Sequence, residues 1–231
     1  NECNFCSNFN KRFRKREPSK IVDEFEHLID IYKADSIYLV GDNLNLNKKM
    51  LLELCNNIIT RGLNIKWICV TLEPMSIDRE IADKMRHSGC VRATFGFESG
   101  SQEMLDSLNK KVSLDKAKKS IEILNRSGID IVATFILGSP GESEKTLEDT
   151  INFIKLSKFK ACSASILAPL PGSNIFKKLI NKYADYDKLD IIPLYNLQDI
   201  YINDFCYVDR IKLENIKNKI ADMFRENWDL Y

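Results

Sequence analysis

Two cysteines near the beginning of the chain have the spacing of a metal-binding turn. Cys3 and Cys6 enclose Asn4 and Phe5, and a basic run follows at positions 11–16. A Cys-x-x-Cys turn lets both sulfur atoms point at one centre, as zinc and iron–sulfur sites require. By itself the pair is compatible with half of a zinc site, a redox-active dithiol or part of an iron–sulfur loop.

Two carboxylates follow apolar segments that have the composition of strands. Asp42 comes after the segment 36–40, and Glu98 comes after the segment 91–97. A carboxylate at the end of a strand accepts hydrogen bonds from an ammonium group or from sugar hydroxyls. The alternative is an acid that caps a helix or lies on the surface.

Glycines mark a third chemically useful loop, which follows the apolar segment 129–137. Gly138 and Gly141 allow the backbone to approach a flat ring closely, although a tight strand-to-helix turn uses the same residues. Glu142 fits the end of this loop and also precedes a helix, where an acid favours the helix dipole.

Helical and strand-like segments alternate along the chain, which predicts one domain with a parallel sheet. Helical spacing of apolar residues occurs at 18–32, 48–60, 77–87, 114–126 and 146–156, and strand-like runs occupy 36–40, 65–70, 91–97, 129–137 and 161–167. Gly62, Gly89 and Gly128 each stop a helix just before the next strand. The polar loops after the strands should therefore gather at one edge of the sheet, where such folds bind ligands.

Periodicity weakens after Phe176. The segment 183–194 is acidic and aromatic without a clear period, and 200–208 is compatible with a strand. The segment 211–227 predicts an amphipathic helix that closes the chain.

Bulk composition excludes several classes of protein. The 231 residues include 34 basic and 33 acidic side chains, and this balance argues against a nucleic-acid binder. We therefore interpret the basic run 11–16 as a solvated surface. The sequence has neither an apolar run long enough to cross a membrane nor a signal peptide at its start. Seven scattered cysteines do not form a disulfide framework and suit the reducing cytosol.

The remaining cysteines and the histidines have no metal-binding spacing. His27 and His87 lie in predicted helices without a partner, so we assign neither to a metal. The other thiols are predicted to be core residues; they are Cys55, Cys69, Cys90, Cys162 and Cys206.

The motifs together resemble the radical S-adenosylmethionine (SAM) superfamily, and within it the branch that often carries an upstream cobalamin-binding domain. The resemblance covers Asn1 to about Phe176. Cys3-Asn4-Phe5-Cys6 matches the last two cysteines of the signature Cys-x-x-x-Cys-x-aromatic-Cys. The first cysteine of the signature and the first strand would lie upstream of Asn1, so we expect an N-terminally truncated core.

Four further segments resemble motifs of the same family. Val40-Gly41-Asp42-Asn43-Leu44 corresponds to the second-strand motif that holds the methionine amino group of SAM. Phe95-Gly96-Phe97-Glu98-Ser99-Gly100-Ser101 corresponds to the fourth-strand motif near the ribose and methionine. Phe135 to Glu142 and Ala168 to Ser173 correspond to the segments beside the adenine. Leu72 stands where relatives commonly show an arginine after the third strand.

The resemblance implies a set of site residues. The implied cofactor-binding residues are Phe5, Gly41, Asp42, Asn43, Glu98, Ser99, Ile136, Gly138 and Pro169, and the implied metal ligands are Cys3 and Cys6. The implied cofactors are a 4Fe–4S cluster and SAM, with cobalamin from an absent upstream domain as a further candidate. The catalytic residues cannot be named from the sequence.

The implied fold is α/β: a partial (β/α)6 TIM-like barrel, with a parallel sheet, helices outside and the first strand missing. We expect a core at 1–176 and a C-terminal extension at 177–231 packed on the same domain. The implied activity is reductive cleavage of SAM to a 5′-deoxyadenosyl radical that acts on an unidentified substrate, by methylation or another C–H functionalisation. The implied partners are this substrate and an electron donor such as flavodoxin or ferredoxin, in the cytoplasm.

Two other hypotheses stay open at this point. A zinc protein or a thiol-redox protein would use Cys3 and Cys6 alone and would have no affinity for SAM. A degenerate barrel would act only as a binding module. As written, the chain supplies two of the three expected cluster ligands, so by itself we expect it to be inactive.

Overall fold

The computed structural model describes residues 3–7, 14–41, 43–182 and 194–228, and helices alternate with strands through most of them. The strands are β1 (Ser36–Val40), β2 (Lys66–Leu72), β3 (Cys90–Glu98), β4 (Asp130–Leu137) and β5 (Ala161–Ile166). The helices are α1 (Pro18–Tyr32), α2 (Lys48–Thr60), α3 (Arg79–His87), α4 (Gln102–Ser107), α5 (Leu114–Arg126), α6 (Glu144–Leu156), α7 (Asn174–Lys182), α9 (Leu194–Phe205), α10 (Arg210–Asp222) and α11 (Arg225–Trp228), and a 3-10 turn, η1, spans Leu44–Leu46.

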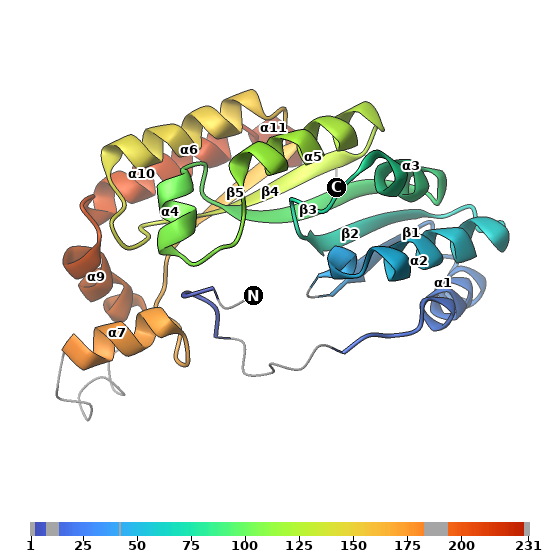
Figure 1. Cartoon of the computed structure of the whole chain (residues 1–231), viewed down its shortest axis with the longest axis horizontal. Helices are drawn as coiled ribbons and strands as arrows, with labels where there is room; N and C mark the ends of the chain where they lie inside the picture. The colour runs from blue at the N-terminus through green and yellow to red at the C-terminus, as the bar shows by residue number, and fades with distance from the viewer. Residues whose placement is uncertain (1–2, 8–13, 42, 183–193, 229–231) are drawn as a thin grey trace.

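The strands form one parallel sheet in the order β1-β2-β3-β4-β5. Sequential order with every pair parallel requires a crossover after each strand, and the helices supply these crossovers on the outside of the sheet (Figure 1). The prediction of an α/β fold with a parallel sheet and helices outside is confirmed. The sheet has the arrangement of a partial TIM-like barrel.

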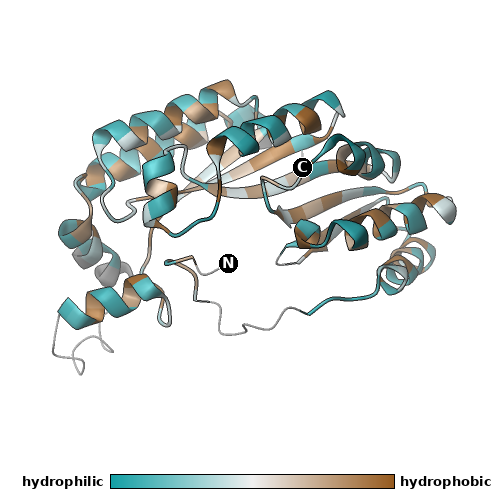
Figure 2. Cartoon of the chain, in the orientation of Figure 1, coloured by the Kyte–Doolittle hydropathy of each residue, from teal (hydrophilic) through white to brown (hydrophobic). Residues whose placement is uncertain are grey.

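The core lies between the sheet and the helices that cover it. Along β4, Ile131, Ala133, Phe135 and Leu137 are buried, whereas Thr134 and Ile136 between them are only half-buried. Phe97, Phe135, Phe153 and Phe159 form an aromatic cluster with ring centroids 5.3–6.3 Å apart. Figure 2 shows the strands as the hydrophobic centre of the molecule, beneath helices whose outer surfaces are mostly hydrophilic.

Helix termini agree with the glycine and cap signals in the sequence. Asn47, Asp78 and Ser113 cap α2, α3 and α5 by accepting a hydrogen bond from the backbone N–H three residues on. Ser143 and Thr146 form a reciprocal capping box at the start of α6. The predicted bounds of α1, α2 and α5 are confirmed.

Two predictions for the C-terminal part were wrong. The segment 200–208 is not a strand: α9 spans Leu194–Phe205, and the rings of Tyr201 and Phe205, one helical turn apart, stack at 5.1 Å. β-branched residues gave this segment a strand-like composition, but packing on the core selects the helix. The closing helix is also interrupted, because α10 ends at Asp222 and α11 begins at Arg225.

The sequence patterns missed two helices. α4 has only six residues, too few to show a period, and α7 begins at Asn174, where the apolar periodicity weakens. The predicted aperiodic segment 183–194 lies almost wholly outside the described residues.

Candidate functional site

The cysteine turn is held by Asn4, which bonds to two distant parts of the chain. The Asn4 backbone N–H donates to Leu108 O at 2.9 Å and its side-chain Nδ2 donates to Ser107 O at 2.9 Å. Its backbone oxygen accepts from Ile175 N at 3.0 Å, and Asn174 Nδ2 donates to its Oδ1 at 3.3 Å. The turn therefore lies between the end of α4 and the start of α7, as Figure 1 shows.

The two thiols of this turn are free and differ in exposure. Cys6 N donates to Cys3 O at 3.2 Å, which closes the turn. Cys6 is exposed and Cys3 is half-buried, and burial raises the pKa of the Cys3 thiol while the Lys110 ammonium opposes this shift. Phe5, between them, packs partly buried against the core. Among the residues that the structure describes, no group of three His, Cys, Asp or Glu side chains could hold a metal ion.

Glu98 forms a buried ion pair beside the cysteine turn. Lys110 Nζ lies 2.9 Å from Glu98 Oε1, and the two side chains are only 15% and 11% exposed. Both charges act on the Cys3 thiol, which places the pair close to it. A Cβ on Gly96 would lie 2.5 Å from Glu98 Oε1, so glycine at this position makes room for the carboxylate.

Lys110 is the residue that sequence reasoning missed. It lies in the loop between α4 and α5, next to Lys111, which is exposed. The sequence gives no reason to prefer one of these adjacent lysines. The structure distinguishes them, because Lys110 donates to Glu98, twelve residues earlier in the chain. The available sequence signal is a carboxylate at a strand end, followed by two lysines in the second loop after that strand.

Two residues at strand ends have left-handed backbones that non-glycine residues rarely adopt. Thr71 has φ 85° at the end of β2, and Glu98 has φ 70° at the end of β3. The register of the sheet shifts at both places, between Val70 and Leu72 and between Gly96 and Glu98. Strain of this kind is concentrated at functional sites, because a packed environment must hold it in place.

The ends of β1 and β2 meet through Asn45. Its Oδ1 accepts from Glu73 N at 2.7 Å and its Nδ2 donates to Glu73 O at 2.8 Å. Near this clamp, Asn43 Oδ1 and Glu73 Oε1 are buried acceptors without a hydrogen-bond partner in the described part of the chain. Gly41 is exposed, with no atom within 4 Å of an added Cβ. Asp42 lies outside the described residues, so its predicted role is not tested.

Ser99 has a hydroxyl that is already used inside the fold. It lies 3.1 Å from Thr150 Oγ1 on α6 and accepts from Ser101 N at 3.1 Å. Gly100 is packed so closely against α6 that an added Cβ would lie 2.6 Å from Phe153 Cβ. These contacts give the Ser99 side chain a structural role, and its predicted contact with a cofactor stays a prediction.

The glycine loop after β4 is packed against the C-terminal helices. Gly138 has φ 80°, and an added Cβ would lie 3.1 Å from Leu213 Cδ1 on α10. Glycine is therefore required here by backbone conformation and by close packing. Ile136 is half-buried near the end of β4, and Pro169 is buried just after β5. Leu167 N donates to Leu137 O at 2.8 Å, which joins the two segments.

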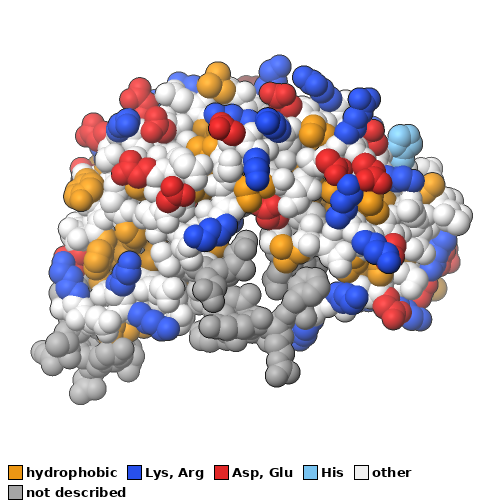
Figure 3. All heavy atoms as spheres, viewed as in Figure 1, with side chains coloured by type: hydrophobic (Ala, Val, Ile, Leu, Met, Phe, Trp, Pro, Cys, Tyr) orange, Lys and Arg blue, Asp and Glu red, His pale blue; other side chains and the backbone are white. Residues whose placement is uncertain are grey.

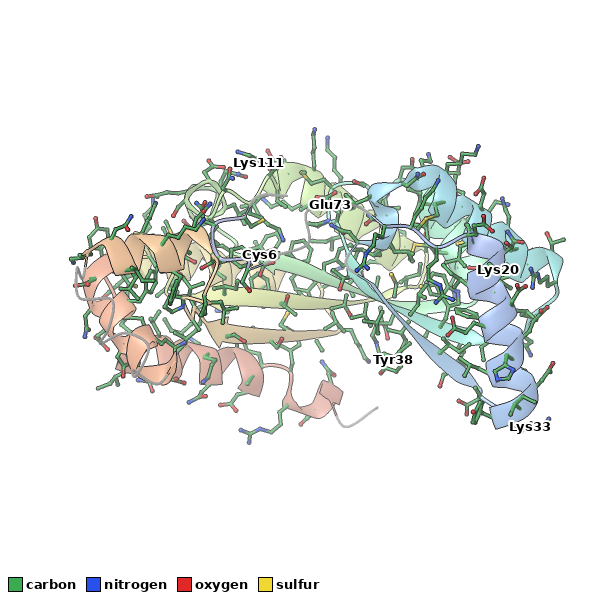
Figure 4. The ribbon with its side chains drawn as sticks, turned by 90° about the horizontal axis from the view of Figure 1, so that it is seen from below. Cys6, Lys20, Lys33, Tyr38, Glu73 and Lys111 are labelled. Carbon is green, nitrogen blue, oxygen red and sulfur yellow. The ribbon has the colours of Figure 1, made fainter. Side chains whose placement is uncertain are left out.

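The described site residues come from the cysteine turn and from the ends of β1, β3, β4 and β5, and these strand ends share one edge of the parallel sheet. Cys3, Glu98 and Lys110 lie together, and Asn43 and Glu73 are linked to the neighbouring strand ends. In Figure 4, Cys6 and Glu73 lie along the middle of the molecule, whereas Lys20 and Lys33 mark α1 at its far end. The thiol pair, the buried ion pair and the two acceptors without a described hydrogen-bond partner thus lie at that edge.

Comparison with protein families identifies the superfamily of the chain. Residues 1–154 match the model of the radical SAM superfamily. The chain belongs to the radical SAM superfamily. Membership implies a 4Fe–4S cluster and SAM as cofactors.

The chain is similar in sequence to a cyclase and a methyltransferase. The chain is 29% identical over 188 residues to the anaerobic magnesium-protoporphyrin IX monomethyl ester cyclase of Rubrivivax gelatinosus, covering 80% of the chain and 34% of the relative. It is 28% identical over 196 residues to the bacteriochlorophyllide d C-12(1)-methyltransferase of Chlorobaculum tepidum, covering 81% of the chain and 42% of the relative. The chain thus spans less than half the length of these relatives.

Solved radical SAM structures share the fold. The methyltransferase TsrM from Kitasatospora setae, solved with cobalamin and a [4Fe–4S] cluster, gives a TM-score of 0.73 at 18% identity, covering 80% of this chain and 35% of TsrM. Coproporphyrinogen III oxidase (HemN) from Escherichia coli gives a TM-score of 0.61 at 13% identity, covering 98% of this chain and 50% of HemN.

The surface of this radical SAM domain is mixed in charge. Figure 3 shows Lys and Arg side chains interspersed with Asp and Glu across the visible face. Within the described ranges, no helix is both long and apolar enough to cross a membrane. Arg14, Lys15 and Arg16, at the end of the basic run, are exposed. Cys55, Cys69, Cys90 and Cys162 are buried as predicted, but Cys206 is only half-buried.

Proposed function

We propose that the chain forms the SAM-binding part of a radical SAM enzyme, with Cys3 and Cys6 as two of the three thiolate ligands of its cluster. The observation that supports this most directly is the position of the cysteine turn. Asn4 bonds it to the end of α4, next to the Glu98–Lys110 pair at the carboxyl edge of the sheet. The third thiolate would come from upstream of Asn1.

The residues present fit SAM in three respects. Asn43 Oδ1, a buried acceptor without a partner among the described residues, would accept from the methionine ammonium group. Lys110 would bind the methionine carboxylate, in place of the arginine that Leu72 replaces. Lys110 holds one oxygen of Glu98, and the other would accept from a ribose hydroxyl.

Gly41, Asp42 and Phe5 would complete the methionine end. The backbone at Ile136, Gly138, Ser99 and Pro169 would line the adenine and ribose. A cluster held by Cys3, Cys6 and the third thiolate would supply the electron for reductive cleavage of SAM. The protein residues bind, orient and exclude water, since the cofactors carry the radical chemistry.

The reaction that we favour is methylation or another functionalisation of a C–H bond on a small molecule. The printed names of the relatives support this class, because they include methyltransferases and a cyclase. The TsrM structure, solved with cobalamin, supports cobalamin in an upstream domain as a further cofactor. Enzymes that act on unrelated substrates can share one fold, so the proposal does not name the substrate.

An electron donor is the second partner that the proposal requires. Lys110, Lys111 and Lys116 line a hollow of about 520 Å³ between α4, α5 and the loop that joins them. Asp106 is the one acidic residue among the described residues of this lining, so lysines predominate. The loop follows the Leu108 carbonyl that holds Asn4. A cationic surface beside the cysteine turn favours docking of an acidic donor of the flavodoxin or ferredoxin kind.

Anaerobic reconstitution of the full-length gene product with iron and sulfide tests the proposed function. The expected result is a thiolate-ligated cluster with broad visible absorbance and reductant-dependent formation of 5′-deoxyadenosine from SAM. Cys6→Ala should abolish both, whereas Cys55→Ala, on α2 and far from the turn, should retain both. A protein that binds zinc at Cys3 and Cys6 and leaves SAM intact would refute the proposal and support the zinc alternative.

A further inference from the structure

The C-terminal segment is bonded to two loops at the carboxyl edge of the sheet. Gly141 N donates to Phe205 O at 2.8 Å, and Tyr207 N donates to Glu142 O at 2.9 Å, so the turn after α9 pairs with the loop after β4. Gln198 Nε2 on α9 donates to Ile166 O at 2.8 Å and to Leu167 O at 3.1 Å, at the end of β5. One segment therefore braces both loops that the proposed function places beside the adenine.

Glu142 belongs to the loop after β4, and both oxygens of its carboxylate accept hydrogen bonds within the fold. The residue is 1% exposed, and its Oε2 accepts from Gly138 N at 2.9 Å and from Ser139 N at 3.2 Å. Its Oε1 accepts from Thr146 Oγ1 at 3.1 Å on α6. The carboxylate thus fixes the two peptide units that follow β4, and a capping role alone does not explain bonds directed back towards the strand.

The surroundings of Glu142 contain further polar groups that the fold leaves unsatisfied. Ser139 Oγ and Tyr201 Oη are buried, at 0% and 1% exposure of their residues, and neither has a hydrogen-bond partner within the described residues. Burial raises the pKa of Tyr201, and the charges of Cys206 and Glu142 raise it further, which places these groups close together. Buried polar groups of this kind normally share an ordered water.

We propose that Glu142 is a positioning residue for SAM: through the amides of Gly138 and Ser139 it holds the loop after β4 in the shape that receives the adenine. This inference rests on the proposed function. Glu142 does not touch the adenine; it acts through the loop. The segment from Tyr201 to Tyr207 closes over the carboxylate and excludes bulk water from it.

Three variants of the full-length, reconstituted protein test this role. Glu142→Leu removes both acceptors at similar volume, whereas Glu142→Gln retains an amide oxygen for Gly138 and Ser139 and should rescue binding. Ser157→Ala is the control, because it deletes a buried hydrogen bond to Phe153 O at the far end of α6. The readout is 5′-deoxyadenosine formation with dithionite as reductant, at varied SAM concentration.

Glu142→Leu should raise the KM for SAM about tenfold with a smaller change in kcat. The reason is that the Gly138 and Ser139 amides lose their acceptor, so the loop that receives the adenine is no longer held in shape. Ser157→Ala should lower the Tm without changing the KM. Equal KM values for the wild type and Glu142→Leu would overturn the inference, and so would a Glu142→Gln variant as defective as Glu142→Leu.

Hydrogen exchange keeps the inference testable if SAM is not cleaved at all. In the unliganded protein, the amides of Gly138 and Ser139 should lose protection about tenfold in Glu142→Leu and keep it in Glu142→Gln and Ser157→Ala. Loss of SAM cleavage in the wild type would refute the proposed function. Unchanged exchange at both amides would refute the positioning role independently.

Discussion

Glu98 and Lys110 depend on each other because both charges are buried. Removing one partner leaves the other charge desolvated, so Lys110→Met should lower the free energy of unfolding by about 3 kcal/mol. The double variant Glu98→Gln with Lys110→Met should recover part of this loss. Urea unfolding of the wild type, Glu98→Gln, Lys110→Met and the double variant measures the cycle. Lys111→Met is the matched control, and a loss equal to that of Lys110→Met would contradict the buried pair.

Glu142 should make stability depend on pH. Burial raises its pKa from 4.5 to about 7, so the folded state binds the proton more tightly than the unfolded state between these values. Protonated Glu142 contributes up to about 3 kcal/mol to the free energy of unfolding. This contribution is fully present below pH 4.5 and is lost as the pH rises through 7. The urea concentration at the unfolding midpoint should therefore fall as the pH rises from 5 to 8. In Glu142→Gln, the midpoint should depend less on pH.

The neighbours of Glu142 do not titrate in this window. Burial raises the pKa of Cys206 to about 11 and raises that of Tyr201 above its usual range. A slope that persists unchanged in Glu142→Gln would assign the pH dependence to another group.

Residue types at strand ends could be predicted, but side-chain partners could not. The position of Glu98 after an apolar run placed it at the carboxyl edge of the sheet. Its pairing with Lys110 and not Lys111 depends on a left-handed backbone at Glu98 and on the room left by Gly96. Likewise, the sequence could not show that the Ser99 hydroxyl is turned to Thr150.

At the scale of elements, the two predicted glycines of the site should respond differently to substitution. Gly138→Ala places a side chain at φ 80° and 3.1 Å from Leu213, so it should cost about 2 kcal/mol of stability. Gly41→Ala meets open space and should leave the Tm nearly unchanged. Thermal unfolding measures both variants. Equal Tm values for the two variants would contradict the prediction, and would mean that α10 shifts to make room for the new side chain at position 138.

Long periodic elements were predictable because their own pattern decides them. α1, α2 and α5 have clear apolar stripes; α1 begins at a proline, and α2 and α5 have side-chain caps at their first turn and a glycine just beyond their last. α9 was mistaken for a strand because its β-branched residues have no decisive period, and its helical state depends on packing against the ends of β4 and β5. The boundary between the core and its C-terminal extension stays a prediction.

For the whole molecule, the lysine hollow should control electron delivery and not chemistry. Lys111→Glu with Lys116→Glu should slow SAM cleavage supported by an acidic donor protein roughly tenfold at low salt, because charge steers such encounters. The same variant should match the wild type with dithionite. Lys145→Glu, on α6, is the control. An equal loss of SAM cleavage rate with dithionite would contradict this prediction, because it would show that the lysines act in the cofactor site.

The bonds of Asn4 also set a constraint on biogenesis. Its partners Ser107 and Asn174 lie 103 and 170 residues further along the chain. Until α7 has been synthesised, the cysteine turn can bond to the end of α4 but lacks its second anchor at Asn174 and Ile175. Under the proposed function, the turn would therefore reach its final position for the cluster only after most of the polypeptide has emerged, and a product that ends before α7 would hold the turn on one side only.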